Sequence, residues 1–496
     1  MAFLAQKLAT DGGGESVVFL NEIVAQLWPN INKAGSKMLK DIADPMLKAT
    51  LPGPLSSLHF TKVDFGEVPM RFSNAVTTKT DSDGIKVDMN VDWDGKCDIE
   101  LDGAMVPALG VEHVKLQGRL ELVLCPLINV LPLIGAVQAA FINPPSLKLD
   151  FTGAANIADL SVIDDSIRQV ILDIINGMAT LPNRYLTVKL DEANDWFRTY
   201  IPPLGIIRVT VKQAWGFAEE SKTKTKKLLS KLTGAAPDCY ARVSVGAEEP
   251  WQTSTKDNLI NPTWNETHDF VVSDYNQSIQ IDVKDKDMNA DDDVGLAVVL
   301  VKDIMSIGGQ QELPLKHKGE STDGVVSVAC EYFELDAGNA SLSASEHKGE
   351  GKICGIANIL VAGAFNVKGH REALRPSVVV KWGPKLRYQT AMVTGTPGID
   401  TNNPAFDQNF RVPVTADMVG SGAESFRIAL MDGEKEVGGV EVPFKNVVGA
   451  PGMTLQDRFD VGGGTTVRAS IGLRGLKAAG AQNMALPERQ KHKPAS

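Results

Sequence analysis

The chain has 496 residues, a formal net charge of -11 and a hydrophobic fraction of 43%. A chain of this length is too long to fold around a single hydrophobic core, and it predicts about three domains. The negative charge argues against a general nucleic-acid-binding protein, which would present a basic surface. Five scattered cysteines without a C-x-x-C pair favour buried thiols in a reducing compartment over a disulfide framework.

The first predicted element is a helix over residues 20–33, LNEIVAQLWPNINK. Ile23, Leu27 and Ile31 recur at the spacing of one helix face, so this helix is expected to be amphipathic. Proline normally ends or bends a helix, and Trp28-Pro29 therefore predicts a bend in its middle.

A pair of strands is predicted next. Apolar and polar residues alternate strictly over residues 85–93 and again over residues 97–102. Such alternation indicates one apolar face and one solvated face, here an acidic one. Asp94-Gly95, between the two runs, predicts a tight hairpin turn.

Residues 122–142 form a stretch of 21 residues without a charge, which is long enough to cross a membrane. Pro126 and Pro132 would leave backbone groups without hydrogen-bond partners in lipid, which argues against a span. The alternative is a buried strand over residues 120–125, a turn, and a short helix over residues 133–142.

A second helix is predicted over residues 157–180, and Leu181-Pro182-Asn183 ends it. Its apolar residues form one broad stripe, made by Ile163, Ile167, Val170, Ile171, Ile174, Ile175 and Met178.

Short strands separated by polar turns predict a β-sandwich over residues 206–335. The region 352–476 repeats this organisation, and its NPAFDQNF motif matches the earlier NPTWNETHDF motif of residues 261–270. We interpret the repeat as an internal duplication. Residues 337–351 form a Gly/Ser/Ala-rich linker, and residues 477–496 are predicted to be a disordered, mildly basic tail.

Three segments, in this order, resemble the lipid-harbouring SMP (synaptotagmin-like mitochondrial-lipid-binding) domain of the extended synaptotagmins and tricalbins. They are residues 20–33, PLINVLPLIGA at 126–136, and ILDIINGMATLPNRYLTVKL at 171–190. NPTWNETHDF and the later VKDKDMNADDDVG segment resemble a C2 domain of synaptotagmin type. The resemblance implies an α+β chain: an elongated, tubular, TULIP-like SMP domain followed by two all-β C2-type sandwiches. The implied boundaries are 15–200, 204–336 and 352–476.

The resemblance also implies a function. It is glycerophospholipid binding and non-vesicular lipid transfer between apposed membranes at contact sites, with docking by the C2 domains. Alternation alone favours a sheet packed on an ordinary core, whereas the resemblance favours a lipid tunnel. The residues expected to line the tunnel are Val87, Met89, Val91, Leu122, Leu124, Ile134, Val137, Ile171, Ile175 and Met178. The alternative function is a C2-based tether or scaffold without transfer activity.

The implied partners are phospholipids, a membrane surface and a second copy of the chain bound through the SMP domain, with no nucleic acid. The implied location is the cytoplasmic face of membranes at endoplasmic reticulum contact sites, peripherally and without a transmembrane segment. The sequence lacks G-x-S-x-G, H-E-x-x-H and P-loop motifs, so we expect no enzyme.

Five carboxylates cluster within residues 285–293, and clustered oxygens are what Ca²⁺ prefers. An acidic loop without a metal is more often a solvated turn. The resemblance implies a calcium site in the first C2 domain only, with ligands Asp238, Asp285, Asp287, Asp292 and Asp293. The second aspartate of the family's first loop has no clear match, so the site is expected to be incomplete.

A basic insertion replaces that aspartate. Its lysines, Lys222, Lys224, Lys226, Lys227 and Lys231, either form a solvated face or contact anionic lipid. In the third region Arg375 stands where Asp238 stands in the second, and no calcium is expected there.

Overall fold

The structure is a computed structural model that describes residues 16–478, except residues 52, 81–82, 105, 153–159, 191–195, 217–236, 288–290, 308, 339–341, 343–351, 384–385, 396–398 and 421–424. The chain divides into two compact units. The first holds residues 1–194 with residues 246–249 and 276–278, and the second holds the remaining residues.

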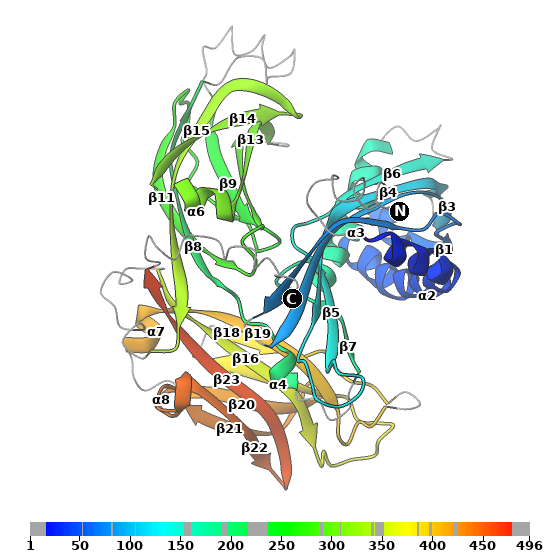
Figure 1. Ribbon diagram of the computed structural model, residues 1–496, viewed down its shortest axis with the longest axis vertical. Helices are drawn as coiled ribbons and strands as arrows, with labels where there is room; N and C mark the ends of the chain where they lie inside the picture. Colours follow the sequence, from blue (N-terminus) through cyan, green and yellow to red (C-terminus); the bar gives the residue numbers. More distant parts are fainter. Residues whose placement is uncertain are drawn as a thin grey trace, which may run out of the picture. The chain divides into compact units, whose positions relative to one another are not determined.

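An antiparallel sheet of seven strands forms the first unit, together with two long helices (Figure 1). In chain order the elements are α2 (Val18–Thr50), η1 (Gly53–Ser57), β1 (His59–Asp64), β2 (Arg71–Thr80), β3 (Gly84–Gly103), β4 (Val106–Leu124), β5 (Ala136–Phe141), β6 (Ser146–Thr152), α3 (Leu160–Ala179) and β7 (Tyr185–Lys189). The strand order is β1-β3-β4-β5-β7, with β2 paired to β3 and β6 paired to β4. Trp28 of α2 and Ile167 of α3 share one buried core with odd-numbered residues of β3, so both helices cover the same face of the sheet.

Helix α2 forms where the sequence predicted a helix, but the three residues of the predicted apolar face, Ile23, Leu27 and Ile31, are exposed. It passes through Pro29 and Pro45 without interruption. Trp28 is buried, whereas Phe19 and Ile23 are exposed. Trp28 Nε1 donates a hydrogen bond to the Gly66 carbonyl at 2.8 Å, which ties the helix to the segment after β1.

The predicted hairpin turn at Asp94-Gly95 is wrong. Strand β3 is continuous from Gly84 to Gly103 and pairs with β4 along most of its length. The apolar alternation stays in phase across Gly95, which is typical of one long strand. A Cβ at Gly95 would lie 2.7 Å from Trp93 Nε1, so this glycine makes room for the indole.

The short helix predicted over residues 133–142 is also wrong. Ala136–Phe141 is strand β5, and it pairs with Leu120–Leu124 of β4. Alanine favours helices, but so short a segment gains little as a helix, and pairing with β4 satisfies its backbone groups. The uncharged stretch is therefore strand, loop and strand. Within the part of the chain that the structure describes, no helix is long and apolar enough to span a membrane.

The second unit contains two β-sandwiches, which confirms the fold class expected for this part of the chain. The first has β8 (Gly205–Trp215), β9 (Cys239–Val245), β10 (Trp251–Gln252), β11 (Thr263–Val272), β12 (Ser278–Asp285), β13 (Asp292–Leu300), α6 (Val301–Ile307), β14 (Gln310–His317) and β15 (Glu320–Asp336), preceded by the short helix α4 (Trp196–Thr199). The second has β16 (Ile353–Phe365), β17 (Pro376–Trp382), β18 (Leu386–Gln389), β19 (Ala405–Thr415), α7 (Ala416–Gly420), β20 (Ser425–Asp432), β21 (Lys435–Pro443), α8 (Phe444–Val448), η5 (Pro451–Met453), β22 (Thr454–Gly462) and β23 (Thr465–Ala478).

Matching hydrogen bonds support the internal duplication. In the first sandwich the Ala241 amide donates to Thr253 Oγ1 at 2.9 Å. In the second, the Val378 amide donates to Thr390 Oγ1 at the same distance. Both threonines are buried, so each repeat uses one hydroxyl to satisfy an equivalent strand amide.

The two sandwiches are joined by a strand pairing. Phe333–Asp336 of β15 pairs antiparallel with Gly475–Ala478 of β23. Beside it, Arg208 Nε donates to Asp269 Oδ1 at 2.7 Å, and Asp269 Oδ2 accepts the Ile353 amide at 3.1 Å. A buried carboxylate of the first sandwich therefore holds the first strand of the second.

Candidate functional site

The inner face of the first sheet is built from paired apolar residues. The register places Ile85 opposite Leu124, Val87 opposite Leu122, and Met89 opposite Leu120. Strand β5 extends these rows, with Val137, Ala139 and Phe141 paired to the same three β4 residues. We call these nine side chains the apolar rows. None of them is charged, and six of the predicted lining residues lie on this face of β3, β4 and β5: Val87, Met89, Val91, Leu122, Leu124 and Val137.

The remaining predicted lining residues lie on helix α3 and in the loop after β4. Ile171, Ile175 and Met178 are half-buried and pack against the same core as Leu120 and Val91. Ile134 forms a bridge to Leu127 in the loop that joins β4 to β5. The helix stripe and the strand alternation therefore meet on one side of the sheet.

Burial changes along this inner face. Val87, Leu122, Leu124 and Val137 are half-buried, whereas Val91 and its neighbours farther along β3 are buried. Apolar side chains that stay partly accessible on the inner side of a sheet can contact an apolar ligand. The end of the sheet that begins at Ile85 is thus the part suited to bind one.

A buried ionic cluster lies on the opposite face of the same strands. Glu121 is 2% exposed, and its Oε1 accepts from Arg184 Nη2 at 2.8 Å and Nε at 3.2 Å. Lys86 lies 3.4 Å from Glu121 Oε2 and 3.3 Å from Asp88 Oδ2. Sequence reasoning missed this cluster, although the Leu-Pro-Asn-Arg segment that supplies Arg184 was singled out.

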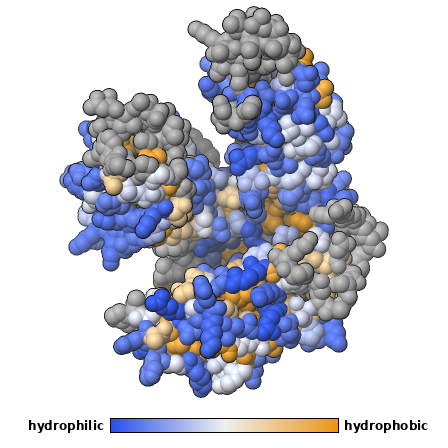
Figure 2. Space-filling view, turned by 180° about the vertical axis from the view of Figure 1, so that it is seen from behind, coloured by the Kyte–Doolittle hydropathy of each residue, from blue (hydrophilic) through white to orange (hydrophobic). Residues whose placement is uncertain are grey.

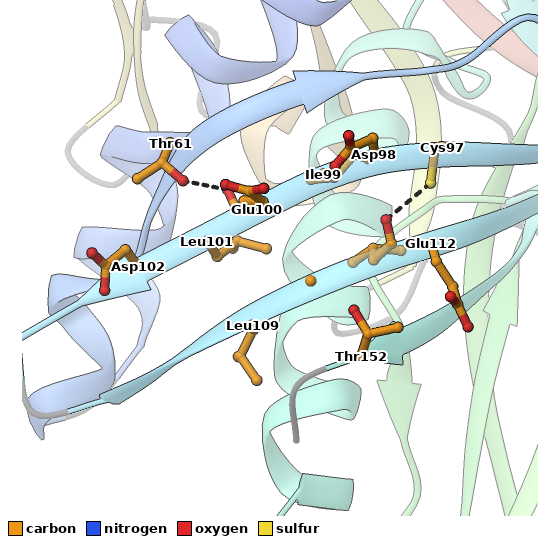
Figure 3. A pocket seen from close by; sticks show the side chains of 12 residues that line it. Thr61, Cys97, Asp98, Ile99, Glu100, Leu101, Asp102, Leu109, Glu112 and Thr152 are labelled. Carbon is orange, nitrogen blue, oxygen red and sulfur yellow. Dashed lines mark hydrogen bonds between the residues drawn. The ribbon is translucent and has the colours of Figure 1, made fainter. Parts of the chain in front are cut away.

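A pocket of about 530 Å³ lies at the other end of β3 and β4 (Figure 3). None of the ten predicted lining residues contributes to it. Asp98, Glu100, Asp102 and Glu112 line it, so it does not suit an acyl chain. Its thiol, Cys97, donates to the Val111 carbonyl at 3.3 Å. Burial raises the pKa of Cys97 to about 11, which keeps the thiol protonated and unreactive.

The acidic residues of the first sandwich gather at one end of β9 and β12. The Asp238 amide donates to Asp285 Oδ1 at 2.8 Å. Asp291 accepts from the Tyr240 hydroxyl at 2.6 Å and from the Asp287 amide at 3.0 Å. Burial, followed by this hydrogen bond, raises the pKa of Tyr240 to about 12.

The described residues bring the predicted calcium ligands only partly together. Among the described residues, no three His, Cys, Asp or Glu side chains converge in a way that could hold a metal ion. Asp293 pairs with Lys284 at 2.8 Å. Asp285, Asp287 and Asp238 lie on neighbouring segments, so the structure brings together only part of the predicted set.

Comparisons with known proteins match both units. The family model for the synaptotagmin-like mitochondrial-lipid-binding domain matches residues 13–190. The C2 domain model matches residues 205–317 and 356–458. A solved structure of the SMP, C2A and C2B domains of Extended-Synaptotagmin 2 covers 94% of this chain and all of its own, with a TM-score of 0.62 and 22% identity. The chain therefore contains an SMP domain followed by two C2 domains, and in this it is similar to the extended synaptotagmins.

Curated relatives agree with this assignment. Extended synaptotagmin-3 of Xenopus tropicalis is 30% identical over 295 residues, which are 59% of this chain and 32% of the relative. Extended synaptotagmin-2 of Homo sapiens is 24% identical over 481 residues, which are 93% of this chain and 50% of the relative. The chain spans half or less of the length of these relatives.

The two C2 domains differ at the acidic end. In the second C2 domain the Arg375 amide donates to Asp432 Oδ1 at 2.8 Å, as the Asp238 amide donates to Asp285 in the first. The Gly433 amide bonds the Arg375 carbonyl at 2.9 Å, and Lys286 bonds Asp238 in the same way. Arg375 therefore occupies the place of Asp238, as the sequence indicated.

The five lysines of the basic insertion lie outside the described residues.

Proposed function

We propose that this chain binds glycerophospholipids through its SMP domain and transfers them between apposed membranes at contact sites, while its C2 domains dock on a membrane surface. The observation that carries this proposal is the set of apolar rows. They combine an uncharged inner face with seven side chains that remain partly accessible, whereas Met89 and Phe141 are buried.

The energetics of transfer explain why such a face is useful. Burying one CH₂ group is worth about 0.8 kcal/mol, so exposing two acyl chains with about 30 carbons costs on the order of 20 kcal/mol. A face that keeps the chains out of water while the headgroup stays solvated removes most of this cost. Polar residues dominate much of the surface that Figure 2 shows, which suits a carrier that remains soluble between membranes.

Docking is assigned to the C2 domains. We infer that the first C2 domain binds calcium through Asp238, Asp285, Asp287, Asp292 and Asp293, and the hydrogen bond from the Asp238 amide to Asp285 Oδ1 supports this by bringing two of the five together. A bound Ca²⁺ would reverse the local negative charge and attract anionic lipid. The lysines of the insertion would attract the same lipid with or without calcium, at about 1 kcal/mol each.

We also infer a homodimer that forms through the SMP domain and a location at endoplasmic reticulum contact sites with the plasma membrane. The exposed apolar side chains of α2, which include Phe19, Ile23 and Leu27, support a contact between two copies. No turnover of the bound lipid is expected.

Mass spectrometry of lipid that copurifies with the full chain tests the proposal. Stoichiometric glycerophospholipid, together with lipid transfer between two liposome populations, is the expected result. The alternative is a C2-based tether without transfer activity. A protein that clusters liposomes but carries no lipid and moves none would establish the tether and refute transfer.

A further inference from the structure

The loop that joins β4 to β5 carries large apolar side chains at its tip, where water surrounds them. Val130, Leu131 and Leu133 are 60%, 87% and 53% exposed, and Pro132 between them is also exposed. We call residues 130–133 the apolar tip. The value for Leu131 is the highest among the large apolar side chains of the described residues. Three such side chains within four residues form a patch rather than a single exposed residue, and an apolar patch marks an interaction surface.

The backbone of this loop is held by hydrogen bonds of its own. The Leu133 amide donates to the Val130 carbonyl at 2.7 Å, and the Ile128 amide donates to the Leu133 carbonyl at 2.9 Å. The Gly135 amide donates to the Pro126 carbonyl at 2.8 Å. Lipid offers no hydrogen-bond partners, so a segment that enters it must satisfy its backbone groups internally. These three bonds reduce the number of backbone groups that the loop would leave unpaired in lipid.

Leu133 has a φ of +74°, a backbone conformation that is unfavourable for leucine. Glycine and asparagine adopt this conformation with less strain. The Leu133 side chain is 53% exposed, so little packing compensates for the strain. A strained residue that packing does not explain points to a use for its side chain. The apolar side chain itself is therefore the feature that this turn presents.

A bilayer fits the apolar tip better than a second protein does. A stable protein interface buries about 800 Å² on each side, from roughly 20–30 residues, whereas the tip offers four. No charged side chain occurs between Glu121 and Lys148, so the loop carries no charge that would lose its water in the acyl region. Apolar side chains gain free energy from leaving water even when only a few of them enter a membrane.

The apolar tip lies beside the accessible end of the apolar rows. The Leu127 amide donates to the Asp83 carbonyl at 2.9 Å, just before the first pair of the rows. That pair is Ile85 and Leu124, and both side chains are half-buried. A membrane at the tip would therefore lie next to side chains that are suited to contact a lipid.

We propose that the apolar tip inserts into the facing leaflet of a membrane, so that the SMP domain contacts the bilayer directly and independently of the C2 domains. The exchange of lipid at this point rests on the function proposed above, whereas the insertion does not. Because the tip is uncharged, its contact with lipid should be insensitive to calcium and to salt. The docking proposed for the C2 domains should depend on both.

Flotation of the full chain with phosphatidylcholine vesicles, in a calcium chelator and high salt, tests the insertion. These conditions remove the attractions to calcium and to anionic lipid that the C2 domains would use. The wild-type protein is expected to float with the vesicles. Leu131→Ser should lower its affinity for them roughly tenfold, because a leucine side chain no longer leaves water. Since Leu131 is almost fully exposed, this change should not alter the melting temperature.

Leu133→Asn separates insertion from packing. Asparagine tolerates the positive φ better than leucine does, so this variant should melt no lower than the wild type and yet lose affinity for the vesicles. Val298→Ser is the matched control, since Val298 is a valine of the first C2 domain with a similar exposed fraction of 56%. It should float as the wild type does.

Two results would overturn the insertion: a wild-type protein that stays unbound in this assay, or folded Leu131→Ser and Leu133→Asn variants that float as the wild type does. Light scattering checks the alternative occupant, because a dimer that is lost in Leu131→Ser would show that a second copy covers the tip. A wild-type protein that floats through the tip but neither carries nor moves lipid would instead overturn the proposed function and leave the insertion standing.

Discussion

Arg184 Nη2 lies 2.8 Å from Glu121 Oε1, and the two residues are 63 positions apart in the sequence. Glu121 is on β4 and Arg184 follows the Leu-Pro-Asn segment that ends α3, so the pair fixes the return of the chain onto the sheet. The hydrogen bond therefore gives a structural role to the arginine of the Leu-Pro-Asn-Arg segment, which is part of one of the three segments that resemble the SMP domain.

Removing Arg184 should destabilise the SMP domain strongly. Arg184→Met removes both hydrogen bonds to the buried Glu121 Oε1 and leaves Lys86, 3.4 Å from Oε2, as the neighbouring cation. Breaking a buried pair typically costs about 3–5 kcal/mol. Urea unfolding measures the loss. Lys62→Met is the control, since Lys62 pairs with Asp98 at an exposed position, where a pair contributes about 1 kcal/mol or less. Equal losses in the two variants would contradict the assignment.

Filling the inner face should block transfer without unfolding the chain. Val91→Trp and Ile171→Trp each add volume beside the apolar rows, from β3 and α3 respectively. We expect a several-fold lower rate of lipid transfer between liposomes. Asp92→Trp places the same side chain on the outer face and should transfer as the wild type does. Undiminished transfer by folded Val91→Trp and Ile171→Trp would argue against lipid in this region.

Calcium and the basic insertion should contribute separately to membrane binding. Asp285→Asn with Asp287→Asn should remove the calcium-dependent part of binding to anionic liposomes, because the charges that hold the ion are lost. The amide oxygen that replaces the carboxylate of Asp285 can still accept the Asp238 amide, so the fold is preserved. Replacing the lysines of the insertion with Gln should lower the salt-sensitive binding seen without calcium.

Asp432→Asn in the second C2 domain is the control for calcium and should leave its effect intact. Isothermal titration calorimetry gives an independent measurement. If no calcium binds to the wild-type protein up to millimolar concentration, the acidic loop of the first C2 domain is a solvated turn.

Stability of the first C2 domain should depend on pH through His268. Burial lowers the pKa of His268, whose ring stacks on Trp251 at 5.2 Å. In the unfolded chain the pKa of a histidine is about 6.5. Below that pH the unfolded chain therefore binds a proton at His268 more readily than the folded domain does. The contribution of the neutral His268 to the free energy of unfolding is present above the unfolded pKa. It is lost as the pH falls toward the lowered pKa of the folded domain.

Thermal unfolding between pH 7.5 and pH 5 measures this dependence. His268→Phe keeps the aromatic contact and should flatten the decline in melting temperature on the acid side. His59→Phe changes an exposed histidine and should retain the wild-type decline. A wild-type slope in the His268→Phe variant would assign the pH dependence to other groups.

The dimer should depend on the exposed face of α2. Phe19→Glu with Ile23→Glu places charge on side chains that are 68% and 49% exposed. Light scattering on the full chain should show twice the monomer mass for the wild type and the monomer mass for this variant. Lys37→Glu, elsewhere on the helix, should remain dimeric. A wild-type protein that is monomeric at micromolar concentration contradicts the dimer.

The periodic patterns in the sequence predicted which side chains share one face of a strand. Contacts between residues distant in sequence determined the strand pairings, which these patterns did not predict. The period-2 alternation placed Val87 and Val91 on one face, because side-chain direction in a strand is set by the chain itself. Asp94-Gly95 was interpreted as a turn because this pair favours hairpins, although the apolar alternation continues in phase across it, as one long strand requires. Strand β5 was missed because its alanines favour helix and only pairing with β4 makes it a strand.

The buried ionic cluster around Glu121 also could not be predicted from local sequence patterns. Nothing close in sequence indicates that Arg184 would meet Glu121, or that Asp293 would meet Lys284 on the neighbouring strand. The acidic loop was found by composition alone, whereas the positions of its carboxylates depend on Tyr240 and on backbone amides from other segments.

The pairing of β15 with β23 has a consequence for avidity. Four residue pairs and the Asp269 contact to Ile353 hold the two C2 domains together, so the docking surfaces proposed for them keep one spacing. When one domain binds a membrane, the other is presented at a fixed effective concentration, without the entropy that a flexible linker would lose on the second contact. Two weak lipid contacts can then act as one strong attachment, provided that both surfaces reach the same bilayer.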